Sequence, residues 1–225
     1  MSDFTLTKFC PGCGYSIILM MLNKVLVKMG LQSRAVLGLD IGCSLLALNS
    51  LPIDTFQTHH GRVTPVMVGY KRARKDVVCL GLTGDGGAYA IGIQGLLHSA
   101  KRDEPVTIIV VNNSLYAMTG GQTAPTTLKG QKTHTHPLGH TEEVFFGPEL
   151  LKEVVCKDAF LARTAVNDPT NLMLYLEKAI IAQQTDHFSL LEILSFCPTN
   201  WKTTGQATLD YLENLKKEFK VGEIF

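Results

Sequence analysis

Runs of consecutive apolar residues alternate along this chain with stretches in which apolar residues return every three or four positions. The runs predict strands buried on both sides, at residues 35–39, 77–82, 106–111, 160–166 and 188–194. The periodic stretches predict helices, at residues 18–29, 63–75, 89–100, 169–180 and 209–219. This alternation predicts an α/β fold with a mostly parallel sheet and helices on both of its faces.

Local signals support these boundaries. Gly30 can end the first helix, and Asp168 followed by Pro169 is typical of a helix start.

No shift in composition divides the chain, so we expect a single domain over 1–225, with an N-terminal Cys-Pro-Gly-Cys segment and a C-terminal helical tail. The loop at 119–146 is rich in Gly, Thr, Pro and His, and a loop of that length is either functional or disordered.

Composition narrows the function classes. Hydrophobic residues make up 45% of the 225 residues and charged residues 18%, which is typical of a globular protein. Twenty-one basic and 20 acidic residues leave a net charge of +1, so electrostatics favours neither nucleic acid nor a membrane surface as a partner. The chain shows no apolar span of about 20 residues and no signal-peptide pattern, and we expect a cytoplasmic protein.

Glycines surround an acidic residue at the end of the second apolar run, in residues 81–89. Glycines between a strand and a helix let backbone N–H groups approach a phosphate. A dinucleotide loop needs Gly or Ala where this chain has Tyr89, and a nucleotide P-loop needs a Gly-Lys pair, which the sequence lacks. A carboxylate in a phosphate loop requires a cation, so Asp85 predicts Mg²⁺.

A second set of oxygen donors follows at a matching distance. After Gly86, 25 residues precede Asn112 and Asn113, an interval that fits one helix and one strand. The ends of the two strands would then lie beside each other. Each motif alone could be an ordinary turn or strand end. Together, Gly-Asp-Gly and Asn-Asn at this spacing are the signature of a site for thiamine diphosphate and its metal.

Further motifs give a more specific indication, and they are Cys10-Pro11-Gly12-Cys13-Gly14, Ile41-Gly42-Cys43-Ser44, His60-Gly61-Arg62, Tyr116-Ala117-Met118-Thr119-Gly120-Gly121-Gln122 and Pro125-Thr126-Thr127. With them, the chain resembles the β subunit of the 2-oxoacid:ferredoxin oxidoreductases over residues 10–197. The resemblance implies a thiamine diphosphate-binding fold of the diphosphate-domain type.

The resemblance also implies roles for individual residues. Asp85 and Asn113 would bind Mg²⁺ through side-chain oxygens, and Leu115 through its carbonyl oxygen. The cofactor would lie against these residues and against Gly42, Cys43, Ser44, His60, Gly84, Gly86, Gly87, Tyr116, Met118 and Thr119. His59 would be structural, and Arg62 could contact a carboxylate or phosphate or lie at the surface.

Six cysteines are too few for a disulfide scaffold in a chain of this length. The resemblance implies that four of them hold one [4Fe–4S] cluster near the thiamine: Cys10, Cys13, Cys43 and Cys197. The C-x₂-C pair and the Cys-Pro at 197–198 are typical of metal ligands, although four thiolates could instead bind structural zinc. Cys79 and Cys156 are expected to be packed thiols.

The activity implied is the coenzyme A-dependent oxidative decarboxylation of a 2-oxoacid, in which coenzyme A accepts the acyl group, CO₂ is released, and the electrons pass through the cluster to ferredoxin. One alternative is the β subunit of a non-redox thiamine-dependent decarboxylase, which would not need the four cysteines. Another is a non-catalytic iron–sulfur subunit that keeps a vestigial thiamine fold, which would bind no thiamine.

The resemblance further implies a partner. In thiamine enzymes a glutamate of a separate pyrimidine-binding domain activates the cofactor, and no acidic residue here lies in a matching motif. We therefore expect an α subunit with that domain, the assembly being active only as a complex that could include small ferredoxin-like subunits. The catalytic carboxylate would belong to the partner.

One segment departs from the family pattern. Many members carry a basic residue shortly after Gly-Cys-Ser, whereas residues 45–48 here are apolar, so Arg62, Lys129 or another subunit would have to meet an acidic substrate group. The stretch 132–137 resembles the 2-oxoglutarate or branched-chain members of the family more than the pyruvate enzymes. His134, His136 and His140 are expected in a solvated or subunit-facing loop, and Glu142 and Glu143 in a solvated turn.

Overall fold

One sheet organises the chain. The computed structural model describes residues 8–225, and within them seven strands pair in the order β2-β1-β3-β4-β8-β7-β9. Their bounds are β1 Ala35–Leu39, β2 Asp54–Gln57, β3 Val78–Gly84, β4 Thr107–Asn112, β7 Phe160–Ala165, β8 Ser189–Leu194 and β9 Gly222–Glu223. Every neighbouring pair is parallel except β7 with β9, which is antiparallel. The predicted mostly parallel sheet is confirmed.

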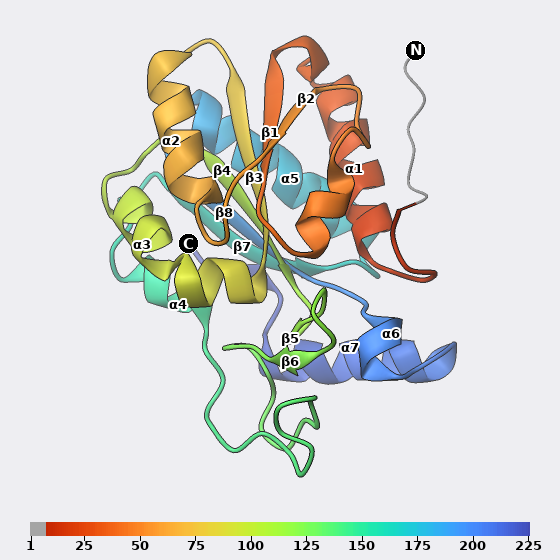
Figure 1. Cartoon of the computed structure of the whole chain (residues 1–225). Coiled ribbons are helices and arrows are strands. Elements are labelled where there is room, and N and C mark those ends of the chain that lie inside the picture. The colour runs from red at the N-terminus through yellow and green to blue at the C-terminus, as the bar shows by residue number, and fades with distance from the viewer. Residues whose placement is uncertain (1–7) are drawn as a thin grey trace.

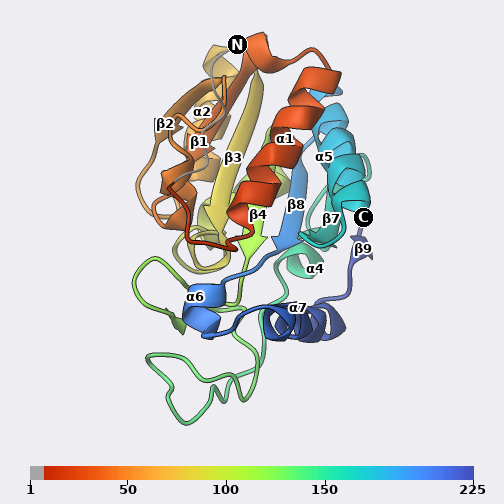
Figure 2. The ribbon, with the colours of Figure 1, turned by 90° about the vertical axis from the view of Figure 1, so that its right-hand side faces the viewer.

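Helices cover both faces of this sheet (Figures 1 and 2). One hydrophobic cluster joins the sheet to α1 (Tyr15–Lys28) and α5 (Pro169–Gln184). A second cluster on the opposite face includes residues of α2 (Val63–Ala73), α3 (Ile93–Lys101) and α4 (Gly147–Lys152). Strands β1, β4 and β8 are buried at every residue, which explains their mostly apolar sequence. Glu192 of β8 is a buried charged exception.

The predicted elements lie close to their expected bounds. Strand β1 matches its prediction, and Asp168 caps α5 by accepting a hydrogen bond from the Asn171 N–H at 3.1 Å. The helix expected over residues 89–100 is divided into a π-helical turn, η3 (Gly87–Ile91), and α3. Gly92 separates them, and a Cβ there would clash with the Gly87 carbonyl and with Gly61. The division therefore reflects the close contact of three glycine backbones.

Several short elements have no counterpart in the apolar pattern. They are η1 (Gln32–Arg34), η2 (Cys43–Ala47), β2, β5 (Leu115–Tyr116), β6 (Gln122–Thr123), α4, α6 (Pro198–Trp201) and β9. Each has two to six residues, which is too short for a period to be recognised. Strand β2 is also a partly exposed edge strand, so burial does not require it to be apolar.

The order of the strands creates a crevice. From β1 the chain turns to β2 on one side, and β3 then pairs on the other side of β1. In open parallel sheets such a reversal leaves a gap at the carboxyl ends of the strands, where ligands bind. Figure 2 shows that the loops after β3 and β4, together with α6 and α7 (Gln206–Glu218), gather at that end of the sheet.

None of the helices in residues 8–225 combines the length and the apolar character that crossing a membrane would require.

Candidate active site

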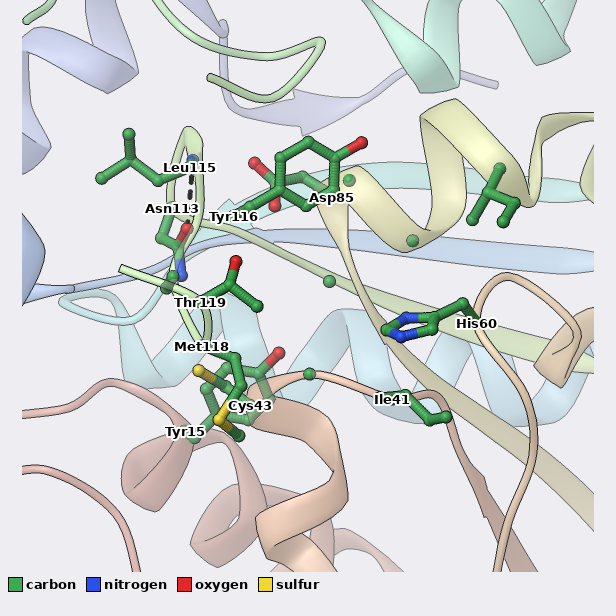
Figure 3. Close-up of a pocket in the computed structure, with 16 residues that line it drawn as sticks. Tyr15, Ile41, Cys43, His60, Asp85, Asn113, Leu115, Tyr116, Met118 and Thr119 are labelled. Atoms are coloured by element: carbon green, nitrogen blue, oxygen red, sulfur yellow. Dashed lines mark hydrogen bonds between the residues drawn. The ribbon is translucent and has the colours of Figure 1, made fainter. Parts of the chain in front are cut away.

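A cavity of about 370 Å³ opens at the carboxyl ends of β1, β3 and β4. Figure 3 shows its walls, with Asp85 and Asn113 at one side, His60 at another, and Cys43, Met118 and Tyr15 along a third. The segment after β1 contributes Cys43, the segment after β3 contributes Asp85, and the segment after β4 contributes Asn113. Three loops that are far apart in the sequence therefore meet around one space.

All the expected cofactor residues except Ser44 line this cavity. Ser44 lies behind the wall, where its Oγ is 2.9 Å from the Oη of Tyr15 and the two hydroxyls share a hydrogen bond. Gly42 has a φ of 130°, a backbone conformation that favours glycine, and it turns the chain from β1 into η2.

Asp85 is a buried carboxylate at the floor of the cavity. It accepts a hydrogen bond from the Thr126 hydroxyl and another from the backbone of Gly86. Burial nevertheless dominates and raises the pKa of Asp85 to about 7. A divalent cation beside Asp85 would supply the positive charge that these neutral donors lack. The site therefore fits a cation with a preference for hard oxygen donors, such as Mg²⁺.

Asn113 supplies a second oxygen at the same place. Its Oδ1 accepts a hydrogen bond from the Leu115 N–H at 3.2 Å, drawn as a dashed line in Figure 3, and its carbonyl accepts one from Trp201 Nε1 at 3.0 Å. Ser114, which lies between Asn113 and Leu115, has a φ of 60° and turns the chain sharply after β4. The turn brings Asn113 and the backbone of Leu115 to the wall that Asp85 shares.

Asn112, which precedes Asn113, is held in place by two hydrogen bonds of its side chain. Asn112 Nδ2 donates to Glu192 Oε1 at 3.0 Å, and its Oδ1 accepts from the Ser114 N–H at 3.0 Å. Glu192 in turn forms a fully buried ion pair with Arg163, which also binds Glu149 through two hydrogen bonds of 2.6 and 2.7 Å. A charged network thus runs from the edge of α4 to the turn that presents Asn113.

Two glycines are needed where the walls approach each other. A Cβ on Gly86 would overlap the ring of Tyr116, and one on Gly87 would overlap the carboxylate of Asp40. These residues precede and begin η3, so their backbones face the cavity without an intervening side chain. Such a surface of backbone groups at the start of a helix suits an anion such as a diphosphate.

Asp40, which our sequence analysis missed, ties these loops together. Its Oδ1 accepts from the N–H groups of Ile41 at 2.9 Å and Gly61 at 2.8 Å, and its Oδ2 accepts from Thr83 Oγ1 at 2.7 Å. Burial raises the pKa of Asp40 despite these three donors. The available signal was its position, because it is an acidic residue directly after an apolar strand. The contacts of Thr126 with Asp85 and of Tyr15 with Ser44 were also not predicted, because the two residues of each pair lie far apart in the sequence.

The four expected cluster cysteines also come together. Cys10, Cys13, Cys43 and Cys197 line a second cavity of about 300 Å³. Burial, together with a smaller contribution from the nearby thiols, raises the pKa of Cys13 to about 11 and that of Cys43 to about 12. Thiols this close, in a partly buried space, are suited to a cationic centre that would stabilise their thiolates.

Four thiols around one space could hold either a single metal ion or an iron–sulfur cluster. Tetrahedral zinc, with Zn–S bonds of about 2.3 Å, holds its sulfur ligands about 4 Å apart. Among residues 8–225, no three of these cysteine sulfurs lie within 4.8 Å of one another. An iron–sulfur cube spreads its ligands over its corners and accepts the wider arrangement. The donor set fits a [4Fe–4S] cluster, which takes one thiolate at each iron.

The two cavities share a wall. Tyr15, Cys43, Asn113, Ala117 and Met118 line both of them. Cys43 is thus one of the four clustered thiols and also a boundary of the cavity that Asp85 lines. Groups bound in the two spaces would be separated by single side chains.

Other expected residues have different positions. Arg62 and Lys129 do not line the described cavity: Arg62 is exposed, and Lys129 pairs with the exposed Glu143 at 2.5 Å. His134 and His136 are exposed, as is Glu142. His140 is 4% exposed, so the expectation of a solvated histidine is wrong there, because its ring packs edge-on against His136 inside the loop.

The two remaining cysteines differ from each other. Cys79 is buried in β3, as expected for a packed thiol. Cys156 is partly exposed, and its Sγ lies 3.8 Å from Nδ1 of His187. The expectation of a packed thiol is therefore wrong for Cys156, since the turn before β7 places it at the surface. His59 is exposed beside His60.

Comparison with known proteins identifies relatives of the whole chain. Residues 40–193 match the model of the thiamine pyrophosphate enzyme, C-terminal TPP binding domain. The 2-oxoglutarate synthase subunit KorB of Archaeoglobus fulgidus is 36% identical over 95% of this chain and 77% of its own length. The ketoisovalerate oxidoreductase subunit VorA of Methanothermobacter thermautotrophicus is 33% identical over 96% of this chain, which spans only 47% of that protein.

A solved structure has the same fold. The 2-oxoglutarate:ferredoxin oxidoreductase from Magnetococcus marinus, with 2-oxoglutarate, coenzyme A and succinyl-CoA bound, superposes with a TM-score of 0.83 at 25% identity. The match covers 94% of this chain and 70% of that one.

Proposed function

Because this chain belongs to the thiamine pyrophosphate enzymes, among the subunits of 2-oxoacid:ferredoxin oxidoreductases, we propose that it is the thiamine diphosphate-binding β subunit of such an enzyme. The proposed reaction converts a 2-oxoacid, coenzyme A and two oxidised ferredoxins into acyl-CoA, CO₂, two reduced ferredoxins and a proton. The single observation that carries this proposal is the shared wall between a cavity with magnesium donors and a cavity with four thiols.

Asp85, Asn113 and the Leu115 carbonyl are the proposed ligands of Mg²⁺, and Gly86 and Gly87 present backbone groups to the diphosphate. His60, Tyr116, Met118 and Thr119 line the remaining walls. When bound, thiamine diphosphate would supply the carbanion-stabilising chemistry that decarboxylation of a 2-oxoacid requires. The residues of this chain would hold the cofactor by its charged end and leave its reactive end toward the open side of the cavity.

Cys10, Cys13, Cys43 and Cys197 are the proposed ligands of a [4Fe–4S] cluster. Cys43 lines both cavities, which supports direct passage of electrons from one to the other. Asn200 Nδ2 lies 3.6 Å from Cys197 Sγ and can donate a hydrogen bond to it. Hydrogen bonds to cluster sulfurs are one of the means by which proteins tune the reduction potential.

A partner subunit completes the proposed site. Of the residues that line the cavity within 8–225, Asp85 is the only carboxylate, and it is assigned to the metal. The group that activates the pyrimidine ring, most of the contacts with the 2-oxoacid, and those with coenzyme A are therefore assigned to an α subunit. The choice between 2-oxoglutarate and branched-chain substrates would be made there.

A non-redox thiamine decarboxylase is the second candidate, because it would use the same magnesium donors. The four gathered thiols favour the redox enzyme, since decarboxylation alone has no need of them.

The test is a cofactor analysis of the complex purified without oxygen together with its partner. We expect a brown protein with thiamine diphosphate, Mg²⁺ and about four iron and four sulfide per chain in addition to any clusters of other subunits, and 2-oxoacid-dependent reduction of ferredoxin. Thiamine without iron in this chain would favour the non-redox decarboxylase. Iron without thiamine would favour an electron-transfer subunit.

A further inference from the structure

Three side chains that can bind metals lie close together at the end of the sheet opposite the proposed active site. Asp103 follows α3, Cys156 precedes β7, and His187 precedes β8. All three lie before the first residue of a strand and therefore at the amino ends of the parallel strands, away from the cavities of the proposed active site. One potential ligand atom of each lies within 4.8 Å of those of the other two.

The geometry of this cluster is specific. His187 Nδ1 lies 2.7 Å from Asp103 Oδ2 and 3.8 Å from Cys156 Sγ. The other carboxylate oxygen, Oδ1, accepts a hydrogen bond from the N–H of Phe188 at 2.8 Å. That bond fixes the carboxylate plane and leaves Oδ2 directed at the ring.

The backbone holds the three residues in place. Asp103 has a φ of 52° and donates its N–H to the Ala100 carbonyl at 3.0 Å, which closes the turn after α3. His187 donates its N–H to the Ala182 carbonyl at 2.9 Å at the end of α5. The cluster is therefore positioned by turns that the fold makes at this edge and does not depend on freely moving side chains.

A nucleophilic triad does not explain this arrangement. In such a triad the histidine uses one ring nitrogen for the nucleophile and the other for the carboxylate. Here the thiol and the carboxylate both face Nδ1 of His187. Burial and the hydrogen bond to Asp103 also raise the pKa of Cys156, which keeps the thiol protonated.

Three donor atoms of these kinds within 4.8 Å of one another are an arrangement that can hold a metal ion. We propose that Asp103, Cys156 and His187 bind a zinc ion through Oδ2, Sγ and Nδ1, with water as the fourth ligand. One sulfur, one imidazole and one carboxylate suit zinc, and three protein ligands leave the fourth position of its tetrahedron open. The side chains of His187 and Asp103 are 28% and 23% exposed, so solvent has access to that position.

Binding would exchange protons for the ion. The thiol proton and any proton held between His187 and Asp103 would go to solvent, and the bond from Phe188 would remain as an outer-shell support of the carboxylate. The ion would then connect the turns before β4, β7 and β8, and a ligand that binds only the folded state raises its stability.

Cobalt(II) is a suitable probe because its thiolate complexes absorb light where the free ion does not. The full chain is titrated with Co²⁺ without oxygen, and the variants Cys156→Ser and Cys197→Ser are compared. The thiolate band of this site should vanish in Cys156→Ser and persist in Cys197→Ser. A band that persists unchanged in Cys156→Ser, or that only Cys197→Ser removes, would assign the ion to the four-cysteine cavity and overturn the proposal.

A second measurement does not depend on the cysteine variants. The control variant His134→Gln changes an exposed histidine outside the proposed site. Zn²⁺ should raise the midpoint of thermal unfolding of His134→Gln by more than it raises that of His187→Gln. The affinity of His187→Gln for Co²⁺ should fall by at least about tenfold, the loss that follows even from removing an outer-shell partner. Equal midpoint increases and equal affinities in the two histidine variants would contradict the site.

Discussion

Asp85 shows at the scale of one residue how a cavity can be prepared for a cation. Its carboxylate is 2% exposed, yet the partners named above are a hydroxyl and a backbone N–H. Burial therefore raises the pKa to about 7, so the ionised form is costly in the free protein. Mg²⁺ would reverse this balance because it binds the ionised form alone.

The first prediction concerns pH. With a pKa of about 7, Asp85 must release a proton when Mg²⁺ and thiamine diphosphate bind below that pH. The affinity for Mg²⁺ should therefore fall by up to about tenfold for each pH unit below 7, and it should level off above 7. Calorimetric titrations at pH 6 in buffers of different ionisation enthalpy would measure the protons released. A value that stays near zero would contradict the assignment of Asp85.

The second prediction concerns the same residue. Asp85→Ala removes a charged ligand and should weaken Mg²⁺-dependent binding of thiamine diphosphate by more than about tenfold, the loss caused by removing even an outer-shell partner. Fluorescence titration of wild type and variant would measure this. Asp76→Asn is the matched control, because Asp76 is exposed and pairs with Arg74 at 2.9 Å. Equal affinity in Asp85→Ala and wild type would exclude the proposed role.

The third prediction separates the cysteines. Cys197→Ser should abolish the brown colour of the anaerobic protein and the reduction of ferredoxin, because Cys197 lies in the four-thiol cavity. Cys79→Ser should keep both, since Cys79 is buried within β3. Iron and sulfide analysis with visible spectroscopy is the measurement. An unchanged iron content in Cys197→Ser would remove it from the set of ligands.

At the scale of elements, strands β4, β7 and β8 are joined by buried charged and polar side chains. Arg163 of β7 and Glu192 of β8 are both fully buried, and Glu192 also holds Asn112 at the end of β4. Adjacent strands thus share one network, and Glu149 of α4 neutralises the second side of Arg163. Since Asn113 follows Asn112 directly, this network positions a proposed metal ligand without touching the metal.

The fourth prediction follows from that network. Glu192→Gln leaves Arg163 with one acidic partner and should lower the free energy of unfolding by about 3 kcal/mol, the lower end for a broken buried pair. The thermal midpoint should fall by roughly 6–12 °C. Glu223→Gln, at the exposed pair with Lys178, should cost less than about 1 kcal/mol. Calorimetry of both variants is the check, and equal losses would argue against a special role of the buried pair.

At the scale of the whole molecule, the proposed cofactor site lies at the open end of the sheet. The cavity lies at the carboxyl ends of the strands, and the long loop at 119–146 gathers on the same side (Figure 1). A reactive carbanion must be kept from water, and a general acid or base must contact the cofactor. A second chain seated over this edge would provide both.

The fifth prediction is that this chain alone reduces ferredoxin or a viologen dye at less than about 1% of the rate of the complete complex. General acid–base catalysis contributes about 10²–10⁴-fold, and the chain alone would lack the required carboxylate. Activity should return when the co-purified partner is added. Full turnover by the pure chain would show that the site is complete without a partner.

The sequence by itself determined the features that depend on neighbours in the chain. Parallel strands that are buried on both faces are mostly apolar, so the runs at β1, β3, β4 and β8 were predictable. The spacing of Asp85 and Asn113 was informative because adjacent parallel strands end at one edge. The two- to six-residue elements escaped notice because no period can be recognised in them.

Only the tertiary structure decided which distant side chains meet. Asp40 binds Gly61 and Thr83, Thr126 reaches Asp85, and Glu192 holds Asn112, each across 21 to 80 residues of chain. Cys156 and His187 are 31 residues apart and meet Asp103 at one point. Such contacts depend on where the loops at the two ends of the strands place their side chains. A hydrogen bond between loops leaves no periodic pattern in the sequence, so its partner becomes apparent only when the chain is folded.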